Sequence, residues 1–148
     1  MTKRDAVPAR YLLDVNILVA LTRADHVHHH RAHEWFSDIA SWATAAVTES
    51  SYLRLMLNPR VAGTTYRTID ILATLRGLRP LPGHQFISDG TTLADAAIDV
   101  TTLIGTKQVT DFHLVNLAAT SGVILATFDG RLKNSLAPAD RHYVHVIA

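Results

Sequence analysis

The stretch "VILATFDGRL" (residues 123–132) carries a run of apolar residues directly into Asp129 and Gly130. Its first five residues have the composition of a buried strand, and Gly122 before them is typical of a helix C-terminus. "YLLDVN" (residues 11–16) repeats the pattern near the N-terminus, where Asp14 follows three largely apolar residues. Both stretches therefore predict a buried strand that ends in a carboxylate.

Strand-like and helical segments alternate along the rest of the chain. Further strands are predicted at 42–47, 84–87 and 142–148, and helices at 16–21, 28–39, 49–57, 65–78, 92–104 and 111–121. Thr48 and Thr110 are expected to cap the helices that follow them. The alternation indicates an α/β fold with a mainly parallel central sheet flanked by helices. Without an internal repeat or linker, the 148 residues are expected to form one domain, 1–148.

Composition excludes several classes of protein. Cysteine is absent, so disulfide frameworks and thiolate zinc sites are excluded. The N-terminus is polar, and no apolar run approaches the roughly 20 residues of a membrane span. We therefore expect a cytoplasmic protein with no membrane contact. The net charge of +1 does not by itself indicate a nucleic-acid partner.

Four acids are predicted to lie at one edge of the sheet. Asp14 and Asp129 follow strands, whereas Glu49 and Asp111 each open a helix. Ligands of a parallel sheet bind at the carboxyl ends of its strands, where the following helices begin. Each acid alone could serve a turn or a helix dipole, but four converging carboxylates repel one another unless a cation lies among them. Mg²⁺ prefers such oxygen ligands, and the chemistry indicated is metal-dependent phosphodiester hydrolysis.

Four stretches of the chain give it a close resemblance to a known family. They are "LLDVNILVAL" (12–21), "TESSYLRLMLNPRV" (48–61), "TDFHLVNLA" (110–118) and "LATFDGRL" (125–132), and "DHVHHHRAHEWF" (25–36) adds a fifth. Their order and spacing resemble those of the PIN-domain ribonucleases, and specifically the VapC toxins of prokaryotic type II toxin–antitoxin pairs. The resemblance covers nearly the whole chain.

The resemblance implies a single PIN domain whose acidic quartet is both metal-binding and catalytic: Asp14, Glu49, Asp111 and Asp129. The expected metal is Mg²⁺, with Mn²⁺ as a possible substitute, and Asn16 and Thr127 would orient the carboxylates. The implied function is that of an endoribonuclease toxin, which cleaves RNA to inhibit translation and is neutralised by a cognate VapB-type antitoxin. A homodimer is also implied. The alternative is a catalytically decayed PIN module that acts only by binding RNA or antitoxin.

Two groups of basic residues allow more than one interpretation. Between residues 50 and 80, one acid (Asp70) accompanies five arginines, namely Arg54, Arg60, Arg67, Arg76 and Arg79. Arg54 and Arg60 are the candidates for RNA binding, and solvated helix faces are the alternative. The histidines from His26 to His33 could bind a metal or lie on a solvated helix face. The metalloprotease pattern is absent, because no glutamate stands between His29 and His33.

Two other classes place acids at strand ends, and the sequence argues against both. A haloacid-type phosphatase needs a second aspartate where Asn16 stands. A phospho-receiver needs a lysine at a late strand end, and neither Lys107 nor Lys133 is so placed.

Overall fold

The computed structural model describes residues 7–148 and shows a five-stranded, fully parallel sheet in the order β3-β2-β1-β4-β5. The strands are β1 (Arg10–Leu13), β2 (Ser41–Ala45), β3 (His84–Ile87), β4 (Ile124–Thr127) and β5 (Val144–Val146). The predicted α/β class and parallel sheet are confirmed. Residues 1–6, which belong to the predicted domain 1–148, lie outside the described residues.

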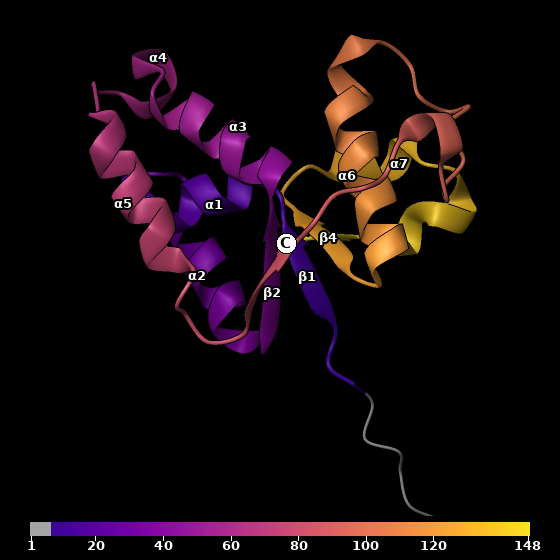
Figure 1. The fold of residues 1–148 in the computed structure, drawn as a ribbon, viewed down its shortest axis with the longest axis horizontal. Helices are drawn as coiled ribbons and strands as arrows, with labels where there is room; N and C mark the ends of the chain where they lie inside the picture. Colours follow the sequence, from indigo (N-terminus) through magenta and orange to yellow (C-terminus); the bar gives the residue numbers. More distant parts are fainter. Residues whose placement is uncertain (1–6) are drawn as a thin grey trace, which may run out of the picture.

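Helices cover both faces of the sheet (Figure 1). They are α1 (Val15–Thr22), α2 (His29–Asp38), α3 (Ala46–Met56), α4 (Pro59–Ala62), α5 (Thr68–Leu78), α6 (Val109–Ser121) and α7 (Gly130–Ser135). The first five lie to one side in Figure 1, whereas α6 and α7 lie to the other. Within residues 7–148, none of the helices is both long and apolar enough to cross a membrane.

The strand alternation divides the core into two layers. Leu12 and Leu125 point to the α6 side and pack with Phe112, and all three are fully buried. Leu13 points to the other side and packs with Tyr52 of α3. Because successive side chains of a strand face opposite ways, the three central strands β1, β2 and β4 supply both layers.

The centre of the sheet is the pairing of β1 with β4, in which Leu13 is opposite Ala126. The backbone N–H of Asp14 continues this ladder by donating to the carbonyl of Ala126 at 2.9 Å. Asp14 is therefore held beside Thr127 at the carboxyl edge of the sheet, where α1 and α7 begin.

The structure corrects the predicted helix at 92–104. Only a 3₁₀ turn (Leu93–Asp95) forms there. Asp99 accepts hydrogen bonds from the backbone N–H (2.9 Å) and hydroxyl (2.6 Å) of Thr101. Such local bonds of an aspartate side chain compete with helix formation.

The two predicted threonine caps are also wrong. Helix α3 begins at Ala46, so Thr48 lies inside the helix. Its hydroxyl accepts from the N–H of Ala45 and donates to the carbonyl of Ala45. Helix α6 begins at Val109, so Thr110 lies in its first turn. Both helices thus start earlier than their threonines predict.

Gly83 fixes the turn into β3 and allows a direct test of the fold. Its φ is +82°, its carbonyl accepts from the N–H of Trp42 at 3.0 Å, and an added Cβ would lie 2.1 Å from the carbonyl oxygen of Ala40. We expect Gly83→Ala to lower the free energy of unfolding by more than about 1 kcal/mol. In α5, Gly77 has nothing within 4 Å of the same position. Gly77→Ala should therefore raise it by about 0.5–1 kcal/mol, as urea unfolding would measure. Equal effects would contradict this account.

Candidate functional site

The hydroxyl of Thr127 joins three of the residues at the sheet edge. It donates to Oδ2 of Asp14 at 2.8 Å, and it accepts from the side-chain amide of Asn16 and from the backbone N–H of Asp129, each at 3.1 Å. The other carboxylate oxygen of Asp14 accepts from the N–H of Val15 at 2.7 Å and so caps α1. The position of the Asp14 carboxylate is therefore fixed from both sides.

Asp129 has a similar place at the start of α7. Its Oδ1 accepts from the backbone N–H of Arg131 at 2.9 Å, which makes it the helix N-cap. Its backbone is tied to Asp14 through Thr127. Two strand ends thus deliver two carboxylates to one short length of the sheet edge.

Asp111 reaches the same edge from the first turn of α6. Burial, followed by the negative charges of Asp14 and Asp129, raises the pKa of Asp111 to about 6. Burial is also the main cause that raises the pKa of Asp14, and the charge of Asp129 adds to it. The three aspartates therefore repel one another, as the sequence analysis expects of carboxylates at one site.

Glu49 has other partners in this structure, so its place beside the three aspartates stays a prediction. Its carboxylate accepts from the hydroxyl of Thr44 (2.7 Å) and, with both oxygens, from Nη2 of Arg79 (2.9 Å). Thr44 is on the same sheet face as Trp42, whereas α6, which carries Asp111, packs on the opposite face. The helical position of Glu49 therefore turns its side chain toward α5.

The donors at this edge are oxygen atoms, which suits a hard divalent cation. Among residues 7–148, no three histidine, aspartate or glutamate side chains form a group that could hold a metal ion as they stand. One buried atom nevertheless suits such an ion: Oδ1 of Asn16 has no hydrogen-bond partner. A buried acceptor of this kind fits a metal-bound water, whose O–H groups would donate to it.

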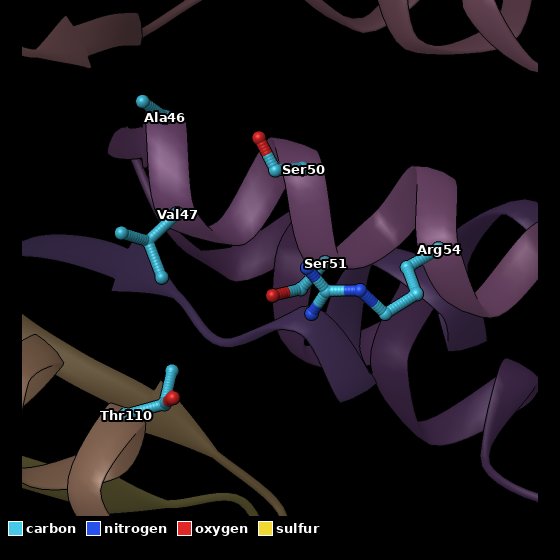
Figure 2. A pocket seen from close by; sticks show the side chains of 6 residues that line it. All are labelled: Ala46, Val47, Ser50, Ser51, Arg54 and Thr110. Atoms are coloured by element: carbon cyan, nitrogen blue, oxygen red, sulfur yellow. The ribbon is translucent and has the colours of Figure 1, made fainter.

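An open cavity of about 330 Å³ lies between α3 and Thr110, the residue that precedes Asp111. It is lined by Ala46, Val47, Ser50, Ser51, Arg54 and Thr110. Figure 2 shows the α3 residues on one side and Thr110, at the start of α6, across the gap. The Arg54 side chain runs back along α3 in this view. A second cavity of about 360 Å³ shares Val47 and Thr110 with it.

The other basic residues of the sequence analysis lie elsewhere. Arg60 is in α4 and is absent from the lining of this cavity. His29 contacts the carbonyl of Ala20 through Nδ1, and His33 contacts that of Leu21 through Nε2, both at 2.7 Å. A ring N–H at these positions satisfies carbonyls of the last turn of α1, so these two histidines fasten α2 to α1.

An acid–histidine pair that was not predicted from the sequence lies close to this edge. Nε2 of His113, in α6, contacts Oδ2 of Asp89, whose other oxygen accepts from the N–H and hydroxyl of Thr91. Burial opposes the charge of Asp89, but the hydrogen bonds from His113 and Thr91 outweigh it and lower the pKa of Asp89. The signal was available, because Asp89 comes two residues after the end of β3, and Asp14 likewise comes just after β1.

Comparison with known proteins gives consistent results. The family model of the PIN domain matches residues 11–135. Ribonuclease VapC38 of Mycobacterium tuberculosis is 44% identical over 120 residues, covering 80% of this chain and 84% of the relative. Ribonuclease VapC39 of the same species is 39% identical over 127 residues, covering 84% and 91%. Ribonuclease VapC44 is 35% identical over 134 residues, covering 87% and 92%.

The fold also matches a solved structure of low sequence identity. The crystal structure of M. tuberculosis VapC20, described as a sarcin-ricin loop cleaving toxin, superposes with a TM-score of 0.53 at 13% identity. The match covers 84% of this chain and 94% of that one. Sequence and fold therefore agree: the chain belongs to the PIN domain family and, within it, to the VapC ribonucleases.

Proposed function

We propose that this chain is a Mg²⁺-dependent endoribonuclease, the toxin of a VapBC pair, which cleaves RNA to inhibit translation until a VapB-type antitoxin neutralises it. One observation carries the proposal: Asp14, Asp111 and Asp129 reach one edge of the sheet, where burial raises the pKa of Asp111 to about 6 and the charges of Asp14 and Asp129 add to the shift. Carboxylates that are held close together despite their electrostatic repulsion are a common feature of functional sites. The relatives named ribonuclease support the same activity.

The three aspartates would hold the cation, with Thr127 and Asn16 orienting Asp14. A bound Mg²⁺ polarises a phosphoryl oxygen and lowers the pKa of a bound water. The chain itself fixes the orientation of the Asp14 carboxylate, since one oxygen accepts from the N–H of Val15 and the other from the hydroxyl of Thr127. Mn²⁺ has similar ligand preferences and is expected to substitute.

The cavity between α3 and Thr110 is the proposed path for RNA. Arg54 offers a guanidinium to a phosphate, and Ser50, Ser51 and Thr110 offer hydroxyls. These groups recognise the RNA backbone rather than its bases. They therefore support RNA binding without naming the sequence that is cleaved.

We also propose a homodimer and a complex with the antitoxin, following the family. Four large apolar side chains are exposed along the segment from the end of α3 to α5: Leu57, Val61, Tyr66 and Ile69. A second protein chain could cover such a surface. The molecular mass of the purified chain in solution tests the dimer.

Removing the cation or one of its ligands should abolish cleavage. Asp129→Asn keeps the N-cap of α7 but removes one negative charge, so RNA cleavage should fall on the order of 100-fold or more. EDTA should have the same effect on the wild type, and Mg²⁺ or Mn²⁺ should restore it. Asp38→Asn, at the exposed end of α2, is the matched control. An Asp129→Asn enzyme with full activity would remove Asp129 from the catalytic site, and cleavage that survives EDTA would contradict the dependence on a metal. A wild type that binds RNA but never cleaves it would favour the decayed binding module.

The raised pKa of Asp111 predicts a pH dependence in metal-free protein. Between its usual value of 3.8 and about 6, the folded state binds more protons at Asp111 than the unfolded state does. The free energy of unfolding should therefore decrease as the pH rises through this window. In EDTA, Asp111→Asn should be more stable than the wild type at pH 7–8, and the difference should shrink toward pH 4. Chemical unfolding at several pH values measures this, and a less stable variant at pH 8 would contradict it.

Arg54 should contribute a phosphate contact. Arg54→Ala should weaken RNA binding whatever the sequence, and it should reduce the slope of log affinity against log salt by about one unit. Arg76→Ala, on the exposed side of α5, is the matched control and should leave the slope unchanged. Binding assays at several salt concentrations, with Ca²⁺ in place of Mg²⁺ to limit cleavage, measure both. Equal slopes for Arg54→Ala and the wild type would remove Arg54 from the RNA path.

A further inference from the structure

Glu49 is held by an ion pair on the side of α3 that faces away from Asp111. Both of its oxygens accept from Nη2 of Arg79, and the Thr44 hydroxyl also donates to it. The Glu49 side chain is 13% exposed, whereas that of Arg79 is 46% exposed. The carboxylate is therefore largely removed from water, and Arg79 provides its counter-charge.

Arg79 is positioned for this contact by its own surroundings. It is the C-cap residue of α5, where its N–H donates to the carbonyl of Arg76 at 3.3 Å. Its guanidinium carbon lies 4.9 Å from the centre of the Phe86 ring, in cation–π geometry. His84 of β3 contacts the same Thr44 hydroxyl at 2.8 Å. The contact thus joins α3, α5, β2 and β3.

The backbone of Glu49 is nevertheless close to the aspartate edge. Val47 and Ser50, on the same turn of α3, line the cavity that Thr110 closes from the other side. Asp111 directly follows Thr110. The movement that we propose below is therefore a change of the Glu49 side-chain rotamer, with the helix itself in place.

We propose that Arg79 is a latch that holds Glu49 away from Asp14, Asp111 and Asp129 in the metal-free protein, and that a divalent cation competes with Arg79 for Glu49. This rests on the proposed metal site. The reason is electrostatic: three carboxylates already repel one another there, and a fourth would add to the repulsion until a cation is bound. Arg79 gives Glu49 a counter-charge in the meantime. Arg79 is thus a positioning residue that sets metal affinity.

A double-mutant cycle on metal binding tests the latch without RNA. Mn²⁺ affinity is measured by calorimetry for the wild type, Arg79→Ala, Glu49→Gln and the double variant. Arg79→Ala should bind Mn²⁺ more tightly, by roughly five- to tenfold, a typical size for coupling between two sites. Glu49→Gln should bind more weakly, and the gain from Arg79→Ala should vanish in its presence. Arg79→Lys, which keeps the charge, should stay close to the wild type.

Control variants separate the possible failures. Arg76→Ala should leave affinity unchanged. If Arg79→Ala has no effect, or if it has the same effect with and without the Glu49→Gln substitution, the latch is wrong. If Asp111→Asn also binds Mn²⁺ as the wild type does, the proposed metal site itself is wrong. Melting temperatures in EDTA show whether Arg79→Ala is folded. Should it unfold, Arg79→Gln, which retains part of the contact with Phe86, replaces it in the cycle.

Discussion

The parallel pairing of β1 with β4 is the constraint on which the rest of the site depends. It places Leu13 opposite Ala126 and extends through the N–H of Asp14, so that Asp14 and Thr127 end their strands side by side. A slip of one residue would turn Asp14 to the other face of the sheet and break its bond to Thr127. The two core layers oppose such a slip, because every side chain of the shifted strand would move to the opposite face of the sheet and lose its packing partners.

Thr127 connects this strand register to the geometry of the candidate site. Its single hydroxyl donates to Asp14 and accepts from Asn16 and Asp129, which uses its full hydrogen-bonding capacity. Valine has nearly the same shape but could make none of these bonds. The hydroxyl therefore links the carboxylate of Asp14 to the backbone of Asp129, and Asn16 keeps a buried free acceptor, Oδ1, beside them.

The two faces of the sheet divide the acids between them. The aspartates lie at the edge next to α6, where burial raises the pKa of Asp111 and of Asp14 and the negative charge of Asp129 adds to both shifts. Glu49 lies on the other side of α3, where Thr44 and Arg79 satisfy its carboxylate. Repulsion at one place and neutralisation at the other have the same physical origin, because a carboxylate removed from water needs a positive partner.

The sequence by itself determined the alternation of strands and helices, the parallel sheet and the arrival of Asp14 and Asp129 at strand ends, because these follow from apolar runs and from local periodicity. It also pointed to Asp111, which opens a helix at the same edge. Only the tertiary structure decided where Glu49 points. The sequence places Glu49 in the first turn of a helix, but it does not give the direction of the side chain. That direction depends on the start of α3 at Ala46 and on the contact with Arg79, thirty residues away. The histidines show the same limit. His29 and His33 read as a solvated face or a metal pair, whereas packing of α2 on α1 sets their rings against the carbonyls of Ala20 and Leu21. The partners of these side chains lie on distant segments of the chain, and such contacts leave no pattern in the local sequence.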